Sequence, residues 1–209
     1  AYSAPLFYRG FPKSCCTSTN HIVCHGIPSD KILQDGDIVN VDVTALKDGW
    51  HGDTSRTFEI GNVSVKAKKL VKTTYEAMMK AISIVKEDIC LGDIGSTIQS
   101  HVEANGFSVV KDFCGHGIGK EFHKEPSILH YGKKGTGEKI KAGMIFTIEP
   151  MINLGKRDVK EMPDGWTIVT KDRSLSAQWE HTILVTENGY EVMTISDQSP
   201  DKEKKNSTK

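Results

Sequence analysis

Two aspartates, Asp42 and Asp53, each stand in the middle of a run that alternates between β-branched and polar residues. Asp48 and Gly49 separate these runs, and an Asp-Gly pair in that position is a strong signal for a β-hairpin. In a hairpin turning there, Thr44 faces Asp53, and Asp42 is the diagonal neighbour of Asp53 on the same face. Diagonal β-carbons lie roughly 7 Å apart, which suits two metal ions about 3.5 to 4 Å apart between the carboxylates. The alternative is a solvated polar face of an antiparallel sheet.

An internal repeat adds further candidate ligands. Residues 36–42 and 143–149 align without gaps, and each ends in a carboxylate at the same spacing from a glycine. A histidine in a glycine-bearing turn precedes each run, and an acidic residue in a later strand follows it. These residues are His25, Asp42 and Asp53 in the first copy, and His116, Glu149 and Glu180 in the second. The repeat predicts two halves facing each other about a pseudo-two-fold axis, with an oxygen-rich site for Mn, Fe, Co or Zn between them.

Two helices must support these strands. Apolar residues recur every three to four positions over residues 64–89, which predicts a helix with Ser64 as its N-cap and Gly92 as its stop. Asp93 is expected to cap a second helix, over residues 93–105, which ends at an Asn-Gly pair. The apolar stripe of each helix must face the sheet.

The remaining strands are expected at 107–113, 143–151, 166–170 and 177–185. Proline cannot donate a hydrogen bond to a neighbouring strand, so Pro150 ends the strand that carries Glu149. The glycines on both sides of His116 predict a loop without regular structure. The lysine and glycine loop at 133–137 is expected to face solvent.

Composition narrows the class of protein. The chain has 209 residues, 37% of them hydrophobic, which is typical of one globular domain. We assign this domain to residues 1–196 and expect the charged segment 197–209 to be disordered. Lys plus Arg and Asp plus Glu both number 27, which argues against nucleic acid or a membrane as a partner. The five cysteines form no C-x-x-C pair, which argues against a disulfide framework or a structural zinc site. The N-terminal residues do not have the pattern of a signal peptide, and we expect a cytoplasmic protein.

The chain resembles a type I methionine aminopeptidase from about residue 6 to residue 195. The resemblance is carried by the residues that match the metal ligands of that family, Asp42, Asp53, His116, Glu149 and Glu180. The resemblance implies an α+β protein of the pita-bread fold, in which two pseudo-symmetric halves share a central curved antiparallel sheet with helices on its outer face. It implies that Asp53 and Glu180 bridge two divalent metal ions. Asp42 then chelates the second ion, and His116 and Glu149 complete the first.

The resemblance also assigns substrate-binding residues. His25 and His123 match the histidines that contact the scissile peptide bond. Asn20 and Ser176 match residues around a monovalent cation in some relatives. Pro5 departs from the family pattern, because relatives often have cysteine there, and the departure concerns the shape of the pocket. The apolar pocket for the methionine side chain maps onto Tyr8, Phe11, Cys16, Phe122 and Trp166.

The activity implied is removal of the initiator methionine from N-terminal Met-peptides of nascent chains, with contact to the ribosome as a further expectation. Metal ions lower the pKa of a water so that hydroxide is available near neutral pH. The resemblance implies that Glu149 accepts its proton and that His25 and His123 polarise the carbonyl and stabilise the tetrahedral intermediate. One alternative is a proline-directed aminopeptidase or prolidase of the same fold, which shares the ligands. Another is a binding protein that has kept the fold and lost catalysis.

The repeat predicts one more feature. Two helices precede the second copy, whereas too few residues for two helices precede the first. We therefore expect upstream residues of the first half to be missing and part of the sheet to present an uncovered apolar surface. This chain alone is then expected to self-associate, and a full-length form to be a monomer.

Overall fold

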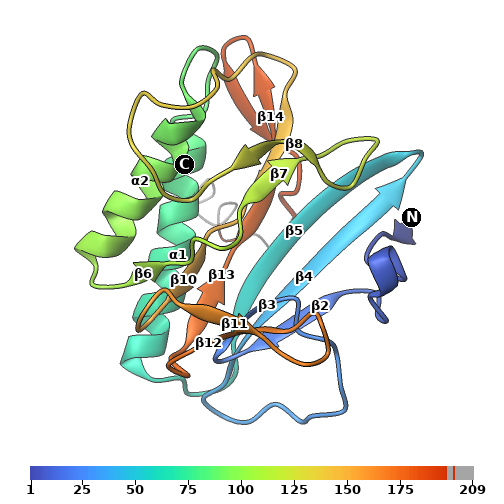
Figure 1. Ribbon diagram of the computed structural model, residues 1–209, viewed down its shortest axis with the longest axis vertical. Coiled ribbons are helices and arrows are strands. Elements are labelled where there is room, and N and C mark those ends of the chain that lie inside the picture. Colours follow the sequence, from blue (N-terminus) through green and yellow to red (C-terminus); the bar gives the residue numbers. More distant parts are fainter. Residues whose placement is uncertain (197–199, 201–209) are drawn as a thin grey trace, which may run out of the picture.

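A computed structural model describes residues 1–196 and 200. Apart from Pro200, the segment 197–209, expected to be a disordered tail, lies outside the described residues. The fold is α+β, with helices α1 (Val65–Ser83) and α2 (Leu91–Ala104) packed on one side of a large antiparallel sheet (Figure 1). No helix among the described residues is both long and apolar enough to cross a bilayer.

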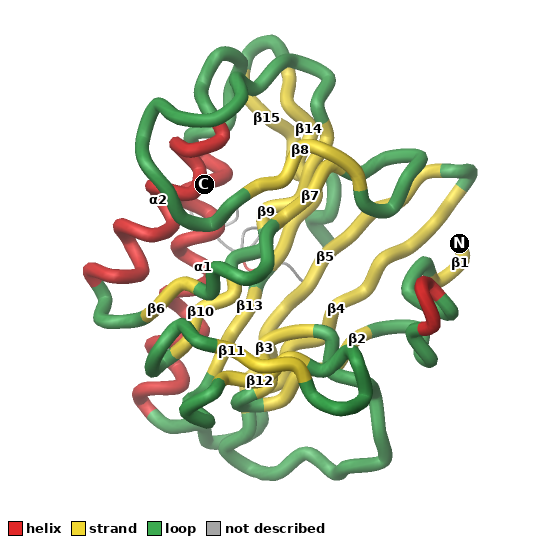
Figure 2. The backbone as a smooth tube through the Cα atoms, viewed as in Figure 1, coloured by secondary structure: helices red, strands yellow, loops and turns green. Residues whose placement is uncertain are grey.

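The strands are short except for one long hairpin (Figure 2). In chain order they are β1 (Tyr2–Ser3), β2 (Cys16–Thr19), β3 (Ile22–Cys24), β4 (Ile38–Lys47), β5 (Trp50–Glu59), β6 (Ser108–Val109), β7 (Gly115–Gly117), β8 (Lys124–Ile128), β9 (Ile145–Ile148), β10 (Met151–Asn153), β11 (Val159–Glu161), β12 (Ile168–Thr170), β13 (Ser176–Gln178), β14 (Glu180–Thr186) and β15 (Gly189–Val192), with a 3-10 turn η1 (Tyr8–Gly10) after β1.

The main sheet has the order β1-β4-β5-β14-β9-β7-β8, with β2 also paired to β4 and β15 to β14. Its centre is symmetric, because the pair β4 and β5 from the first half meets the pair β14 and β9 from the second. The two halves therefore join where β5 lies against β14. The expected pita-bread arrangement of two similar halves is confirmed.

The hairpin has the register that the sequence predicts. Lys47 lies opposite Trp50, and Thr44 lies opposite Asp53. Asp48 and Gly49 have φ of 52° and 80°, the left-handed values of a two-residue hairpin turn. On the face of the hairpin opposite to Asp42 and Asp53, Val43 is 44% exposed and Phe58 is 41% exposed. Self-association through this half of the sheet stays a prediction.

The first helix begins as predicted and ends earlier. The Ser64 hydroxyl accepts a hydrogen bond from the backbone N–H of Ala67 at 3.2 Å, which is the expected N-cap. The predicted end near Ile89 is wrong, because α1 stops at Ser83 and Asp88 has a φ of 69°, which no helix accommodates. The apolar stripe of α1 packs on β13, β10 and β9, and that of α2 packs on β6 and β8. Both contribute to one core that includes Leu70, Met78, Ile98, Phe146 and Ile183.

Gly92 does not stop a helix but lies in the first turn of α2. A β-carbon there would lie 2.5 Å from the carbonyl oxygen of Lys133, so glycine allows the 133–137 loop to approach the helix. Asp93, predicted as the N-cap, lies instead in the first turn of α2, and the N-cap is Cys90. Its carboxylate accepts from the backbone N–H of Cys90 and from that of Gly135, both at 2.8 Å.

The segment around His116 is strand β7, not the loop expected from its glycines. The glycines serve close packing: a β-carbon at Gly115 would lie 2.3 Å from the carbonyl oxygen of Thr147, and one at Gly117 would lie 2.3 Å from that of Glu125. The strand expected over 177–185 is divided at Trp179 into β13 and β14, which belong to different sheets. The strand expected over 107–113 is reduced to β6.

Candidate metal centre

A cavity of about 420 Å³ opens where the two halves of the sheet meet. Every metal-ligand, catalytic and substrate-pocket residue predicted from the sequence lines it: Asp42, Asp53, His116, Glu149, Glu180, His25, His123, Tyr8, Phe11, Cys16, Phe122 and Trp166. Pro5 also lines the cavity. The residues come from both halves, as the repeat requires.

Strand register explains why three of the acidic residues converge. Ser55 of β5 lies opposite Asp42 of β4 on one side and opposite Glu180 of β14 on the other. Asp53 stands two positions from Ser55, and side chains two positions apart share a face of the sheet. Asp42, Asp53 and Glu180 therefore project from the same face.

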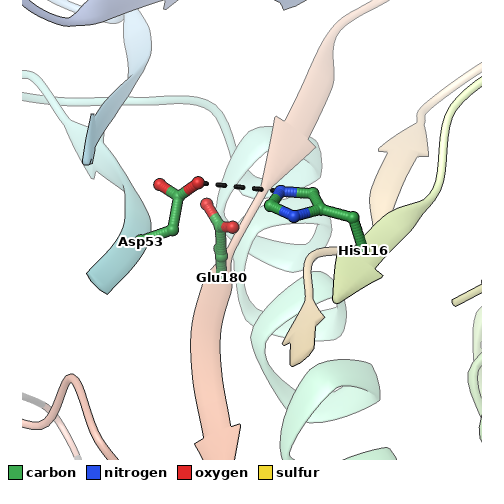
Figure 3. Close-up of side chains that lie close together, drawn as sticks. All are labelled: Asp53, His116 and Glu180. Carbon is green, nitrogen blue, oxygen red and sulfur yellow. Dashed lines mark ion pairs between the residues drawn. The ribbon is translucent and has the colours of Figure 1, made fainter. Parts of the chain in front are cut away.

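The closest group of donors is formed by Asp53, His116 and Glu180, each of which offers one ligand atom within 4.8 Å of the others. Their side chains point toward one another from β5, β7 and β14 (Figure 3). Nε2 of His116 lies 3.7 Å from Oδ2 of Asp53 and 3.6 Å from Oε1 of Glu149. Nδ1 of His116 lies 3.1 Å from the carbonyl oxygen of Gly117. An N–H at Nδ1 donates to that carbonyl, which leaves Nε2 as a free lone pair facing the carboxylates.

Neutral side chains orient Glu149. The Thr147 hydroxyl donates to Oε1 of Glu149 at 2.7 Å and accepts from the backbone N–H of His116 at 3.0 Å. The Gln178 amide donates to Oε2 at 3.3 Å. The backbone N–H of Glu149 donates to Nε2 of the fully buried His130 at 3.2 Å. One threonine therefore fixes two candidate ligands relative to each other.

Two further threonines hold Asp53. The Thr44 hydroxyl, opposite it in the hairpin, donates to Oδ1 at 2.8 Å. The Thr182 hydroxyl lies 3.0 Å from the backbone N–H of Asp53 and 2.8 Å from its carbonyl oxygen. Oδ2 is left facing His116.

The acidic groups are buried together, which disfavours their charged forms. Burial raises the pKa of Asp42 to about 7 and that of Glu149 to about 8. Burial, followed by the charge of Asp42, raises the pKa of Asp53 well above its ordinary value. Burial and then the charge of Asp53 do the same for Glu180. Divalent cations among these carboxylates reverse that effect, and the oxygen-rich set with one imidazole lone pair fits Mn, Fe, Co or Zn.

The remaining wall of the cavity is aromatic. Phe11 meets Trp166 edge to face with ring centroids 5.1 Å apart, and the imidazole of His25 lies 6.2 Å from Trp166. On the other side, Tyr8 packs against Phe122 at 4.9 Å. Cys16 adds a neutral thiol, because burial raises its pKa. The lining suits an unbranched apolar side chain.

Two histidines that are not in the closest donor group reach the cavity. His25 has a φ of 56°, and a β-carbon at the following Gly26 would lie 2.2 Å from the carbonyl oxygen of Thr17. The His25 backbone is thus held in a strained turn against β2. His123 lies with its imidazole centroid 4.2 Å from that of His116. Burial, then the charge of His116, lowers the pKa of His123 to about 3, so its imidazole is neutral near pH 7.

Asn20 and Ser176, which the resemblance assigns to a monovalent cation, lie next to each other. The backbone N–H of Ser176 donates to the carbonyl oxygen of Asn20 at 2.8 Å. Asn20 has a left-handed φ of 57°. Neither residue lines the cavity.

Several residues in or next to the cavity are not identified as site residues by the sequence analysis. Thr147 and Gln178 stand two positions before Glu149 and Glu180, so strand alternation could have placed them on the face of the ligands. Phe113 and Met151 line the cavity without any chemical signal in their residue type. His130 lies two residues after the end of β8, and nothing in the sequence connects it with Glu149.

Comparison with known proteins relates the chain to metallopeptidases. The model of metallopeptidase family M24 matches residues 3–187. The chain is 58% identical to a methionine aminopeptidase of Rickettsia prowazekii over 197 residues, which is 94% of this chain and 76% of that protein. The crystal structure of a methionine aminopeptidase from Thermotoga maritima superposes with a TM-score of 0.92 at 44% identity, covering 93% of this chain and 79% of that one. A prolidase from Pyrococcus horikoshii superposes less well, with a TM-score of 0.70 at 25% identity, covering 88% of this chain and 48% of that one.

Proposed function

Because the chain belongs to metallopeptidase family M24, we propose that it is a methionine aminopeptidase of type I. It hydrolyses the first peptide bond of proteins and peptides that begin with methionine. The observation that carries this function is one cavity in which the acidic and imidazole donors meet a wall of aromatic side chains.

The chain binds divalent metal, and we assign two ions to the cavity. Asp53 and Glu180 would bridge them, Asp42 would hold the second, and His116 with Glu149 would complete the first. When bound, such ions polarise the substrate carbonyl and lower the pKa of a water to near neutrality. Mn, Fe, Co and Zn all fit the donor set.

Glu149 is the residue of this chain that takes the proton of the attacking water. Its buried carboxylate has a raised pKa, and Thr147 and Gln178 hold its two oxygens in fixed directions. A raised pKa brings a carboxylate closer to the operating pH, where a general base works best. The same carboxylate can then return the proton to the leaving amine.

His25 and His123 line the cavity without belonging to the group formed by Asp53, His116 and Glu180, and they would contact the substrate. Each is neutral near pH 7, since burial lowers the pKa of both. A neutral imidazole offers one N–H donor, and donors fixed in advance stabilise the oxygen on which charge develops. Phe11, Trp166 and Cys16 surround the methionine side chain and exclude charged ones.

The alternative function is that of a prolidase or X-Pro aminopeptidase, which shares the fold. The identity of 25% to the prolidase, against 58% to a methionine aminopeptidase, favours methionine. A non-catalytic binding protein is disfavoured by the complete set of donors. A cytoplasmic location, contact with the ribosome, a bound monovalent cation and a monomeric full-length form stay predictions.

A peptide series tests the function. Purified protein with Mn or Co is given Met-Gly-Met-Met and the same peptide with Leu or Lys in first position, together with a Gly-Pro dipeptide. We expect release of methionine, weaker release of leucine, and no release of lysine or cleavage of Gly-Pro. Efficient cleavage of Gly-Pro with no release of methionine would instead identify a prolidase.

A further inference from the structure

The hydroxyl oxygen of Tyr8 lies 3.0 Å from Nδ1 of His123, although the residues stand 115 positions apart. The Tyr8 ring also lies 5.2 Å from the imidazole, measured between centroids. From the sequence, Tyr8 is only one wall of the apolar pocket. The contact gives its hydroxyl a specific polar partner that reaches the same cavity.

The backbone on both sides of Tyr8 is strained. Phe7 and Arg9 have φ of 65° and 47°, which residues with a β-carbon rarely adopt. Hydrogen bonds from Phe7 N to Phe11 O, at 2.8 Å, and from Tyr8 N to Pro5 O, at 3.0 Å, hold this turn. Phe7 is 73% exposed, so its own packing does not explain the conformation. The turn brings the side chains of Tyr8 and Arg9 to the cavity, and the hydroxyl of Tyr8 is the group that it places in hydrogen-bond contact with His123.

A hydrogen bond at Nδ1 decides where His123 carries its proton. A neutral imidazole has one N–H, and its other nitrogen is an acceptor. If the hydroxyl donates to Nδ1, the hydrogen of the imidazole must sit on Nε2. The rings of Phe122 and His116, with centroids 4.0 and 4.2 Å from the imidazole, restrict its rotation.

We propose that Tyr8 is a positioning residue whose O–H donates to Nδ1 of His123 and thereby fixes the tautomer that carries its N–H at Nε2. This inference rests on the proposed function, in which His123 donates a hydrogen bond to the carbonyl oxygen of the scissile bond. Tyr8 thus sets the direction of a donor and does not itself touch the reacting atoms.

Replacing the hydroxyl alone tests the kinetic consequence. Tyr8→Phe keeps the ring against Phe122, and we expect kcat for Met-Gly-Met-Met to fall about 10-fold, at the low end for partners that orient a functional group, with KM unchanged. A role confined to the pocket wall predicts the reverse, a changed KM with kcat intact, and that result would overturn the proposal. Tyr190→Phe, on β15 outside the cavity, is the matched control and should leave both constants unchanged.

A double variant tests whether the hydroxyl acts through His123. In a His123→Ala background the hydroxyl has no imidazole to orient, so adding Tyr8→Phe should lower kcat no further. A second 10-fold loss in that background would show that the hydroxyl acts independently and would contradict the proposal.

A readout without turnover separates this inference from the proposed function. In metal-free protein labelled with ¹⁵N-histidine, the nitrogen shifts of His123 report its tautomer. We expect the Nε2–H form in the wild type and a mixture of both forms in Tyr8→Phe. An Nδ1–H form in the wild type, or the same spectrum in both proteins, would refute the inference. A wild type that shows the Nε2–H form but releases no methionine would refute the function instead.

Discussion

Asp53 and Glu180 project from adjacent strands that belong to different halves of the molecule, and they meet at the junction of those halves. Glu180 lies opposite Ser55, two positions from Asp53, so the two carboxylates share a face. Both are buried, 5% and 2% exposed, and both have raised pKa values. The fold therefore uses its line of symmetry to bring together groups that repel each other without a cation.

Asp53→Asn should remove activity together with metal. The amide keeps the shape of the side chain but loses a charge and replaces one oxygen by a donor. We expect activity to fall by more than about 10²-fold, because even partners of metal ligands cost 10 to 100-fold when changed. Elemental analysis of the purified variant measures the metal, and Asp30→Asn on the exposed 29–34 segment is the control. Full metal occupancy in Asp53→Asn would contradict the bridging assignment.

His123→Ala should separate metal binding from turnover. The imidazole reaches the cavity but is not part of the closest donor group, so we expect metal content to be unchanged. Loss of a preoriented donor should lower kcat by on the order of 10² to 10³-fold. His21→Ala, at a histidine that contacts Arg173 outside the cavity, should leave kcat unchanged. Loss of metal from His123→Ala would make His123 a ligand.

Metal-free protein should lose stability as the pH rises from 6.5 to 8.5. Asp42 and Glu149 have folded-state pKa values of about 7 and about 8, above their ordinary values of 3.8 and 4.5. A raised folded pKa means that the folded state binds more protons, so stability falls as the pH rises through that range. Burial lowers the pKa values of His130 and His181 to about 3 and about 4. These histidines make stability rise with pH, but only below their unfolded pKa of about 6.5, so they do not affect the range from 6.5 to 8.5.

Thermal melts in chelator, at steps between pH 6.5 and 8.5, measure this effect. Each 1 kcal/mol lost should lower Tm by roughly 2 to 4 °C for a chain of this size. Bound metal keeps the carboxylates ionised, so metal-loaded protein should show a flatter profile and the gap between the two forms should widen with pH. A metal-free Tm that rises over this range would contradict the burial of ionisable carboxylates.

Gly26→Ala should displace His25 and leave the metal in place. The new methyl group would lie 2.2 Å from a backbone oxygen of β2, so the turn must shift. We expect a loss of about 1 to 3 kcal/mol in stability, as for overpacked sites, and a lower kcat. Gly52→Ala is the control, because nothing lies within 4 Å of its added carbon. Equal kcat in both variants would mean that the turn does not position His25.

The hairpin and the convergence of the candidate ligands on one cavity could be predicted from the sequence, because they follow from the turn and from the repeat. The Asp-Gly turn fixes the register, and the register fixes which face Asp42 and Asp53 share. The predictions from Gly92 and from the glycines beside His116 are wrong for a common reason. Glycine is typical of breaks in regular structure, but these glycines allow close contact with segments distant in the sequence.

The residues that orient the ligands were harder to predict. Thr147 serves both His116 and Glu149 only because β7 pairs with β9, and this pairing depends on the whole sheet. The contact between Tyr8 and His123 joins segments that no periodicity relates. Sequence patterns thus indicate which groups do chemistry, and tertiary structure decides what holds them.

Restoration of activity to metal-stripped protein tests the central claim most directly. The protein is dialysed against chelator, and methionine release from Met-Gly-Met-Met is followed while Mn, Fe, Co or Zn is added back in steps, with binding measured in parallel. We predict no release without metal, restoration by at least one of these ions, and activity that follows occupancy of the cavity and is absent in Asp53→Asn. Full methionine release by the metal-stripped protein, or metal binding that is unchanged in Asp53→Asn, would contradict the account.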